Sequence, residues 1–179
     1  MGARVILMDI SVERLRTLSE ILHGNFETLA SSPFNVAHTV RTADLLIGAV
    51  LVKGAKAPKV VTREMVSTMK PGSVIVDVAV DQGGCVETTH ATSHSDPTYY
   101  VDGVLHYCVA NMPGAVPRTS TNGLSNATLP YVIELADRGF EAAIAADKSL
   151  ARGVNIYQGK VTYQAVAEAF DLPYTPLKI

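Results

Sequence analysis

The sequence predicts an α/β protein with a doubly wound parallel sheet. Short apolar runs typical of buried parallel strands recur along the first 110 residues. Segments whose apolar residues fall at helical spacing separate these runs. Polar residues follow several of the runs, at the ends of strands where α/β proteins bind their ligands. Strands that alternate with helices in this way form a parallel sheet with right-handed crossovers.

The chain is predicted to begin with a strand, a helix and a second strand. Residues 4–9 form an apolar run that ends in a carboxylate. Ser11 can cap the helix that follows, because a Ser side chain accepts a backbone N–H at a helix start, and Gly24 can end that helix. Residues 26–29 are a short strand candidate, and residues 36–41 form a short helix at most.

Further strands are predicted at residues 44–50, 73–80 and 104–110. Thr62 caps a helix over residues 63–69 that connects the first two of these strands. Between the last two, residues 81–98 are predicted to be irregular.

The pattern changes towards the carboxyl end, where helices dominate. Asn126 is predicted to cap a long helix through residue 138, and further helices are expected at residues 140–152 and 164–170. We expect two domains: residues 1–117 as a partial nucleotide-binding domain and residues 118–179 as the returning part of a second domain.

Composition narrows the class of protein. Hydrophobic residues make up 47% of the chain and charged residues 18%, which is enough apolar material for a buried core. The net charge is −2 and no basic run is present, which argues against nucleic acid as a partner. The apolar runs are far shorter than the ~20 residues that cross a bilayer. Two cysteines, without metal-site or disulfide spacing, make a reduced cytoplasm the expected location.

Asp9, Asp81 and Asn111 stand where predicted strands end. A carboxylate at Asp9 can accept both hydrogen bonds from an adenosine ribose and would repel a 2′-phosphate, which selects NAD over NADP. Alternatively, Asp9 serves only the start of the next helix, together with Ser11. Asp81 precedes two glycines and is an active-site candidate or an ordinary turn residue. Asn111 lies before a Pro-Gly bend and is equally open to either interpretation.

The glycine loop that cradles a dinucleotide pyrophosphate is expected about 20 residues before the ribose-binding acid. Only eight residues precede Asp9. We therefore expect a Rossmann-like sheet without its first strand and glycine loop, and a gap between the strands at residues 4–9 and 44–50. His106 falls within a strand pattern and is interpreted as a core histidine. Lys53, Lys56 and Lys59 are interpreted as a solvated loop, with a phosphate-binding role as the weaker alternative.

Several strings along the chain resemble those of the alanine dehydrogenases. The most specific are Asp81-Gln-Gly-Gly-Cys85 and His106-Tyr-Cys-Val-Ala-Asn-Met-Pro-Gly-Ala-Val-Pro117. Ala43-Asp-Leu-Leu-Ile-Gly-Ala-Val, Gly54-Ala-Lys-Ala-Pro and Asn126-Ala-Thr-Leu-Pro-Tyr131 extend the likeness over nearly the whole chain. The nucleotide-binding subunit of proton-pumping transhydrogenase is similar too, but typically has Gln-Asn-Gly-Gly where this chain has Asp81-Gln-Gly-Gly, so Asp81 favours the alanine enzymes.

The resemblance implies the reversible oxidation of L-alanine by NAD to pyruvate and ammonia. Asp81 would be the catalytic residue, an active-site carboxylate near the substrate amine. There it would stabilise the positive charge that develops as hydride leaves. The cofactor-binding residues implied by the resemblance are Asp9, Arg14, Ser31, Val50, Leu51, Val78, Ala79, Val80, Asp81, Val109, Ala110, Asn111 and Met112.

The resemblance also implies partners. In the family, the Arg and Lys that hold the alanine carboxylate and the His that shuttles protons belong to an amino-terminal portion, which this chain would need as a partner. Relatives assemble as homo-hexamers. The alternatives are a non-catalytic remnant that binds a subunit or nucleotide, a transhydrogenase-like NAD-binding domain and a regulatory NAD-binding module. The predicted function is therefore that of part of an alanine dehydrogenase, with this chain inactive by itself.

Overall fold

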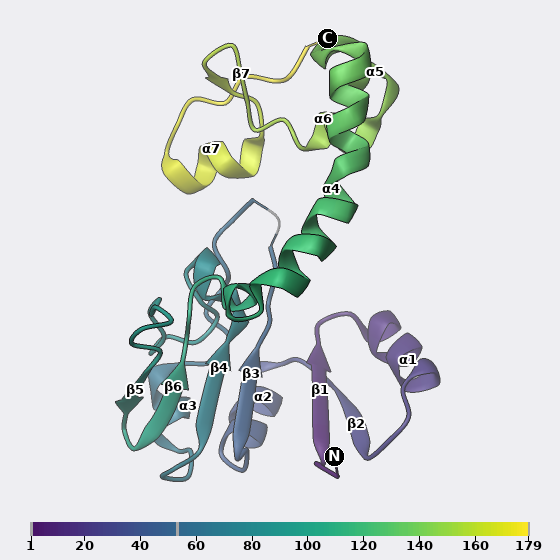
Figure 1. Cartoon of the computed structure of the whole chain (residues 1–179). Helices are drawn as coiled ribbons and strands as arrows, with labels where there is room; N and C mark the ends of the chain where they lie inside the picture. Colours follow the sequence, from purple (N-terminus) through teal and green to yellow (C-terminus); the bar gives the residue numbers. More distant parts are fainter. Residues whose placement is uncertain (1, 53, 179) are drawn as a thin grey trace. The chain divides into compact units, whose positions relative to one another are not determined.

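The computed structural model describes residues 2–52 and 54–178. Strands and helices alternate along its first part, and the chain has the predicted α/β architecture with parallel strands (Figure 1). The chain divides into two compact units. The first unit contains the residues up to Val50 and those from Pro58 to Ala110, and the second contains Leu51–Ala57 and the residues from Asn111 onward.

The first unit begins with a β-α-β element. Strand β1 (Val5–Asp9) pairs in parallel with β2 (Phe26–Ala30), and helix α1 (Val12–Ile21) connects them. Ser11 caps α1 as predicted, since its hydroxyl accepts the backbone N–H of Arg14. These elements confirm the predicted strand, helix and strand at the start of the chain.

A second sheet of the first unit has the strand order β3-β4-β6-β5. The strands are β3 (Leu45–Gly48), β4 (Val74–Asp77), β5 (Thr98–Val101) and β6 (Val104–Tyr107). The β3-β4 and β4-β6 pairs are parallel, and β5 pairs with β6 in the antiparallel sense.

One face of this sheet is well buried. Helices α2 (Pro33–Val40) and α3 (Arg63–Ser67) lie against it (Figure 1). Ile75, Val104 and His106 on this face have no exposed surface. The apolar core of the first unit therefore lies between the helices and this face of the sheet.

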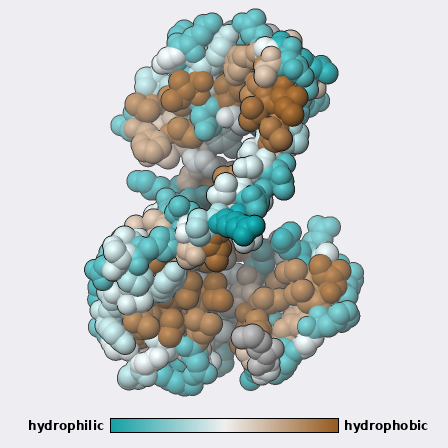
Figure 2. All heavy atoms as spheres, viewed as in Figure 1, coloured by the Kyte–Doolittle hydropathy of each residue, from teal (hydrophilic) through white to brown (hydrophobic). Residues whose placement is uncertain are grey.

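The opposite face of the sheet is open. The strand register places Leu45 beside Val74 and Val74 beside Leu105, so these apolar side chains share that face. Leu45 is 55% exposed, and Ile47 on the same face is 62% exposed. Figure 2 shows hydrophobic side chains gathered over this part of the unit. Parallel sheets are normally covered on both faces, so this face has the character of a surface built to be covered.

The strands β1 and β3 are not paired with each other, as predicted. Among the residues that the structure describes, β1 pairs only with β2, and β3 pairs only with β4. Each of the two strands therefore has one edge of N–H and C=O groups without a neighbouring strand, which is a ready site for another strand.

Three predicted strands are too long. The run at residues 73–80 leaves the strand at Asp77, and Val78–Gln82 form a 3-10 helix, η1. The reason is local: the side chain of Asp77 accepts the backbone N–H of Ala79 and turns the chain away from the sheet. The runs at residues 44–50 and 104–110 likewise end early, at Gly48 and Tyr107.

Strand β5 was missed because the segment to residue 98 was interpreted as irregular. A hairpin signal was present, since Asp102-Gly103 separates two runs rich in aromatic and β-branched residues. Both turn residues have positive φ, 51° and 78°, as a two-residue hairpin loop requires.

Helix α2 begins before the predicted residue 36, because Ser32 caps it.

The second unit is mainly helical. Its elements are the 3-10 helix η2 (Met112–Ala115), α4 (Pro117–Arg138), α5 (Phe140–Ala146), α6 (Lys148–Arg152), the hairpin β7 (Ile156–Tyr157) and β8 (Lys160–Val161), and α7 (Gln164–Phe170). None of the described helices is long and apolar enough to cross a membrane.

Two helix predictions for this unit are wrong. Helix α4 begins at Pro117, and Asn126 lies inside it and is not its cap. Helix α4 also contains Pro130, which has no N–H to donate to the carbonyl of Asn126. The predicted helix at 140–152 is two helices, because the carboxylate of Asp147 accepts the N–H of Ser149 at 2.6 Å and starts a new one.

Candidate functional site

Asp81 lies directly beyond the carboxyl end of β4, on the short helix η1. Its side chain is exposed, and none of the described residues forms a hydrogen bond or ion pair with its carboxylate. Val78 on the same helix is 51% exposed. Side chains three residues apart eclipse one another on a 3-10 helix, so Val78 and Asp81 share one face. The loop therefore presents an apolar surface and a carboxylate together.

The two glycines after Asp81 are required by the geometry of the loop. Gly83 and Gly84 both have positive φ, 91° and 75°. A Cβ atom on Gly84 would lie 2.8 Å from Oδ2 of Asp77 and closer still to the hydroxyl of Thr89. The backbone therefore approaches these side chains as only glycine allows.

Asp77 is the residue of this site that the sequence interpretation missed. The sequence pattern places Asp77 inside an apolar strand, yet its side chain has no exposed surface and accepts hydrogen bonds from the loop that follows. A carboxylate inside a run of valine and isoleucine was the available signal, because a buried charge needs partners. Burial and the neighbouring Asp77 raise the pKa of the Cys85 thiol to about 11.

Lys59 also has a more specific place than the predicted solvated loop. Its ammonium group donates to the carbonyl oxygens of Gly83 at 2.6 Å and of Val86 at 3.1 Å. Next to Asp81, the side-chain oxygen of Gln82 is buried without a hydrogen-bond partner among the described residues. An unpaired buried acceptor marks a point where a donor from outside the described residues would be stabilising.

A second group of predicted residues meets at the ends of β1 and β2. The backbone carbonyl of Asp9 accepts the N–H of Ser31 at 2.9 Å, and Arg14 lies in the first turn of α1. One carboxylate oxygen of Asp9 accepts the N–H of Ser11 at 2.8 Å. Asp9 thus takes part in the helix start, and its second carboxylate oxygen has no hydrogen bond among the described residues.

The other predicted cofactor residues differ in exposure. Ala79, Val80 and Val109 are buried, whereas Val50 and Ala110 are half-buried. Leu51, Asn111 and Met112 belong to the second unit. Within the first unit, Asp9, Arg14 and Ser31 lie at the ends of β1 and β2, and Val78, Ala79, Val80 and Asp81 lie on η1.

His106 is a satisfied core residue, as predicted. Its Nδ1 lies 3.0 Å from the carbonyl oxygen of Val104, which can only accept, so Nδ1 carries the proton. Its Nε2 lies 2.8 Å from the hydroxyl of Thr88, which donates to it. Tyr99 stacks on His106 with ring centroids 5.1 Å apart, and His90 stacks on Tyr99 at 3.9 Å. This arrangement holds a neutral imidazole.

We expect the first unit to lose stability in mild acid because of His106. Burial lowers its pKa below the ordinary 6.5 in the folded state. The unfolded chain therefore binds a proton at a higher pH than the folded chain, and the free energy of unfolding falls as the pH drops from about 6.5 through the folded-state pKa. Urea unfolding at several pH values measures this. His106→Gln should flatten the dependence in this window, and an unchanged slope in that variant would contradict the assignment.

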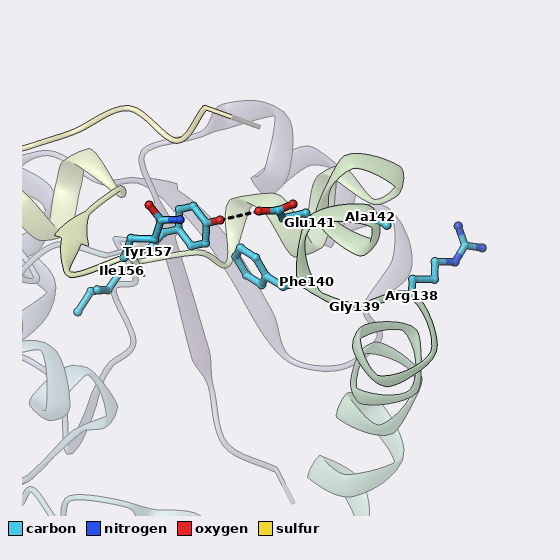
Figure 3. A pocket seen from close by; sticks show the side chains of 8 residues that line it. Arg138, Gly139, Phe140, Glu141, Ala142, Ile156 and Tyr157 are labelled. Atoms are coloured by element: carbon cyan, nitrogen blue, oxygen red, sulfur yellow. Dashed lines mark hydrogen bonds between the residues drawn. The ribbon is translucent and has the colours of Figure 1, made fainter.

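A cavity lies elsewhere, in the second unit (Figure 3). Its volume is about 720 Å³, and its walls come from the start of α5 and the strand β7. Phe140 stacks on Tyr157 with ring centroids 5.0 Å apart, and the hydroxyl of Tyr157 donates to Glu141 at 2.9 Å. None of the predicted site residues lines this cavity, so it is not part of the candidate site.

Known proteins share the sequence of this chain over nearly its whole length. Residues 1–164 match the family model "Alanine dehydrogenase/PNT, C-terminal domain". The chain is 58% identical over 174 residues to an alanine dehydrogenase of Halomonas elongata, covering 97% of this chain and 47% of that protein. It is 54% identical over 177 residues to one of Methanococcus maripaludis, covering 98% of this chain and 48% of that protein.

Solved structures give the same result. An L-alanine dehydrogenase structure matches with a TM-score of 0.82 and 52% identity, over 95% of this chain and 47% of that one. A transhydrogenase from Sinorhizobium meliloti matches with a TM-score of 0.56 and 30% identity, over 64% of this chain and 34% of that one. The chain spans about half the length of the curated relatives that it matches.

Proposed function

Because the chain belongs to the alanine dehydrogenase/PNT C-terminal domain family, we propose that it is the nucleotide-binding half of an NAD-dependent L-alanine dehydrogenase. The reaction converts L-alanine, water and NAD⁺ to pyruvate, ammonium, NADH and a proton, and it is reversible. The observation that carries the proposal is the 58% identity over 97% of the chain to an alanine dehydrogenase. The exposed acid of the Asp81-Gln82-Gly83-Gly84 loop adds a chemical reason.

The residues of the first unit suit an adenine dinucleotide. The free oxygen of Asp9, beside Ser31, can accept a ribose hydroxyl. Ile10, which is 87% exposed, offers an apolar surface next to that carboxylate. At the other group, the exposed Val78 is suited to pack against a nicotinamide ring. A nicotinamide held there would supply the hydride acceptor for the substrate carbon.

Asp81 is proposed as the catalytic residue, acting as an ionised carboxylate. Loss of hydride from the α-carbon of alanine leaves an iminium group, so positive charge develops at the amine in the transition state. A fixed carboxylate beside this group stabilises that charge more than it stabilises the neutral amine. The exposure of Asp81 and the absence of a competing partner among the described residues leave its carboxylate available for this role.

The domains and assembly follow from the same proposal. Residues 1–117 would form a Rossmann-like nucleotide-binding domain, and residues 118–179 would be the part of the substrate domain supplied by this chain. The partner is the amino-terminal portion of the enzyme, and the assembly is a homo-oligomer in the cytoplasm.

A transhydrogenase-like nucleotide carrier is the second candidate, because a transhydrogenase matches 64% of the chain. NAD binding without alanine turnover in the complete protein would favour that candidate.

Asp9 should set the preference for NAD over NADP in the complete protein. Asp9→Ala should shift the ratio of the two affinities towards NADP by about tenfold or more, because the 2′-phosphate would no longer meet a fixed negative charge. Asp9→Asn is the matched variant, since its carbonyl can still accept the N–H of Ser11 and hold the start of α1. Titration calorimetry with both nucleotides measures the ratio. Equal affinities in the unmutated protein would contradict the role given to Asp9.

The direct test of the proposed reaction is NADH formation from L-alanine by a complete protein that contains this chain. L-Alanine should support NADH formation, whereas D-alanine should not. Appearance of pyruvate and ammonium in equal amounts identifies the reaction. NADH formation with no release of ammonium would show a different oxidation.

A further inference from the structure

We propose that Asp77 is a positioning residue, whose buried carboxylate fixes the loop that presents Asp81. No other part of the described chain gathers so many hydrogen bonds on one side chain. The effect on the loop is a property of this chain alone. Its consequence for turnover rests on the proposed function.

The carboxylate of Asp77 accepts from both sides of Asp81 in the sequence. Oδ1 accepts the N–H of Ala79 at 3.0 Å, ahead of Asp81. Oδ2 accepts the N–H of Cys85 at 2.9 Å and that of Val86 at 3.3 Å, beyond Asp81. Asp77 therefore closes the segment 79–85 into a ring, and Asp81 lies within that ring.

Side chains complete the ring. The hydroxyl of Thr89 donates to Oδ2 of Asp77 at 2.7 Å, and the thiol of Cys85 lies 3.6 Å from Oδ1. Lys59 holds the outer side of the loop through its hydrogen bonds to the carbonyls of Gly83 and Val86. The backbone of η1 alone would not hold this shape, because a single short turn must fix several dihedral angles for each hydrogen bond that it gains.

Asparagine cannot replace Asp77 in this role. Every hydrogen-bond neighbour of the two carboxylate oxygens among the described residues is a donor, and the side chain has no exposed surface. Whichever way an asparagine amide is turned, its NH2 group faces at least one backbone N–H. Asp77→Asn keeps the shape of the side chain and leaves buried donors without an acceptor.

The first experiment measures amide hydrogen exchange in this chain, which requires no enzymatic activity. Asp77→Asn should speed exchange at Ala79, Cys85 and Val86 by about tenfold or more relative to the amides of β1 and β2. Thr89→Val, a milder variant, should act in the same direction by about threefold. Asp44→Asn, which removes an exposed acid paired with Lys70, is the control and should change none of these rates.

Unchanged exchange in the loop of either variant would overturn the claim that Asp77 fixes the loop. If Asp77→Asn does not fold, Thr89→Val decides the question alone. Faster exchange throughout the first unit, with no excess in the loop, would also count against it, because the carboxylate would then stabilise the whole unit and not the loop.

The second experiment is a double-mutant cycle in a complete enzyme that contains this chain. Asp77→Asn should lower kcat by about tenfold or more, and it should have no further effect in the Asp81→Asn background, because it acts through Asp81. Effects that multiply would overturn the positioning role. If the unmutated enzyme oxidises no L-alanine, the proposed function fails, while the exchange measurement still decides whether Asp77 fixes the loop.

Discussion

The purified 179-residue chain is expected to form no measurable NADH from L-alanine. The family resemblance implies that the groups that hold the substrate carboxylate and shuttle protons belong to a portion of the enzyme beyond these residues. Orientation of bound reactants can supply roughly 7–11 kcal/mol of a barrier, and without those groups the chain has no clamp for alanine. The measurement is the absorbance of NADH in the presence of L-alanine and NAD, with the intact mass of the sample checked.

The structure gives a second reason for this expectation. The strands β1 and β3 each have an unpaired edge, and the face of the sheet that carries Leu45 and Ile47 is open. One parallel strand added between β1 and β3 would join the two sheets, and a helix on the open face would cover its apolar side chains. We therefore expect the amino-terminal half of a relative to associate with this chain and complete the nucleotide site.

A variant of the open face tests whether this face binds the amino-terminal half. Ile47→Lys places a charge where the covering segment would pack and should prevent association, because a buried unpaired charge is costly. Ser67, an exposed residue at the end of α3, offers the comparison, since Ser67→Lys lies on the helix side of the sheet, off the open face, and should leave association intact. Equal association of both variants would contradict the account of the open face.

In an active, complete enzyme, Asp81→Asn should lower turnover by about 10²–10³, the usual cost of losing one preorganised electrostatic group. The carboxamide has nearly the same shape as the carboxylate but carries no charge to stabilise the developing iminium. Because the catalytic role proposed for Asp81 is exerted on the substrate amine in the transition state, turnover should fall far more than the affinity for NAD. Steady-state kinetics with L-alanine and calorimetry with NAD separate the two effects.

Asp96→Asn is the matched control for Asp81. Asp96 is also an exposed acid of the first unit, placed in the turn before β5. Its replacement should leave turnover within about twofold, as surface changes away from a site usually do. Turnover of Asp81→Asn equal to that of Asp96→Asn would show that the loop carries no catalytic acid.

Local sequence signals predicted the first strands and helices well. Ser11 and Thr62 cap the helices that they were expected to cap, because capping depends on one side chain and its nearest backbone groups. The same local reasoning went wrong at Pro117, where the absence of a capping side chain concealed the true start of α4. It also overlooked Asp102-Gly103, although an Asp-Gly pair is itself a sequence signal for a two-residue hairpin loop. Both residues have the positive φ that such a loop requires.

The candidate site was only partly predictable. Asp81 follows an apolar run and precedes two glycines, which is a pattern visible along the chain. The role of Asp77 depends on donors from Cys85 and Thr89, eight and twelve residues away. Such contacts arise from the fold of the loop, and no spacing rule predicts them. Lys59 is held by the same loop from 24 residues away.

The most direct test of the account mixes this chain with the separately produced amino-terminal half of the Halomonas elongata alanine dehydrogenase and measures NADH formation from L-alanine. The account predicts no activity from either half and turnover of about one per second or more from the complex, the ordinary range for enzymes. Turnover at that rate by this chain alone, or a stable complex of the two halves that binds NAD and leaves L-alanine unchanged, would contradict it.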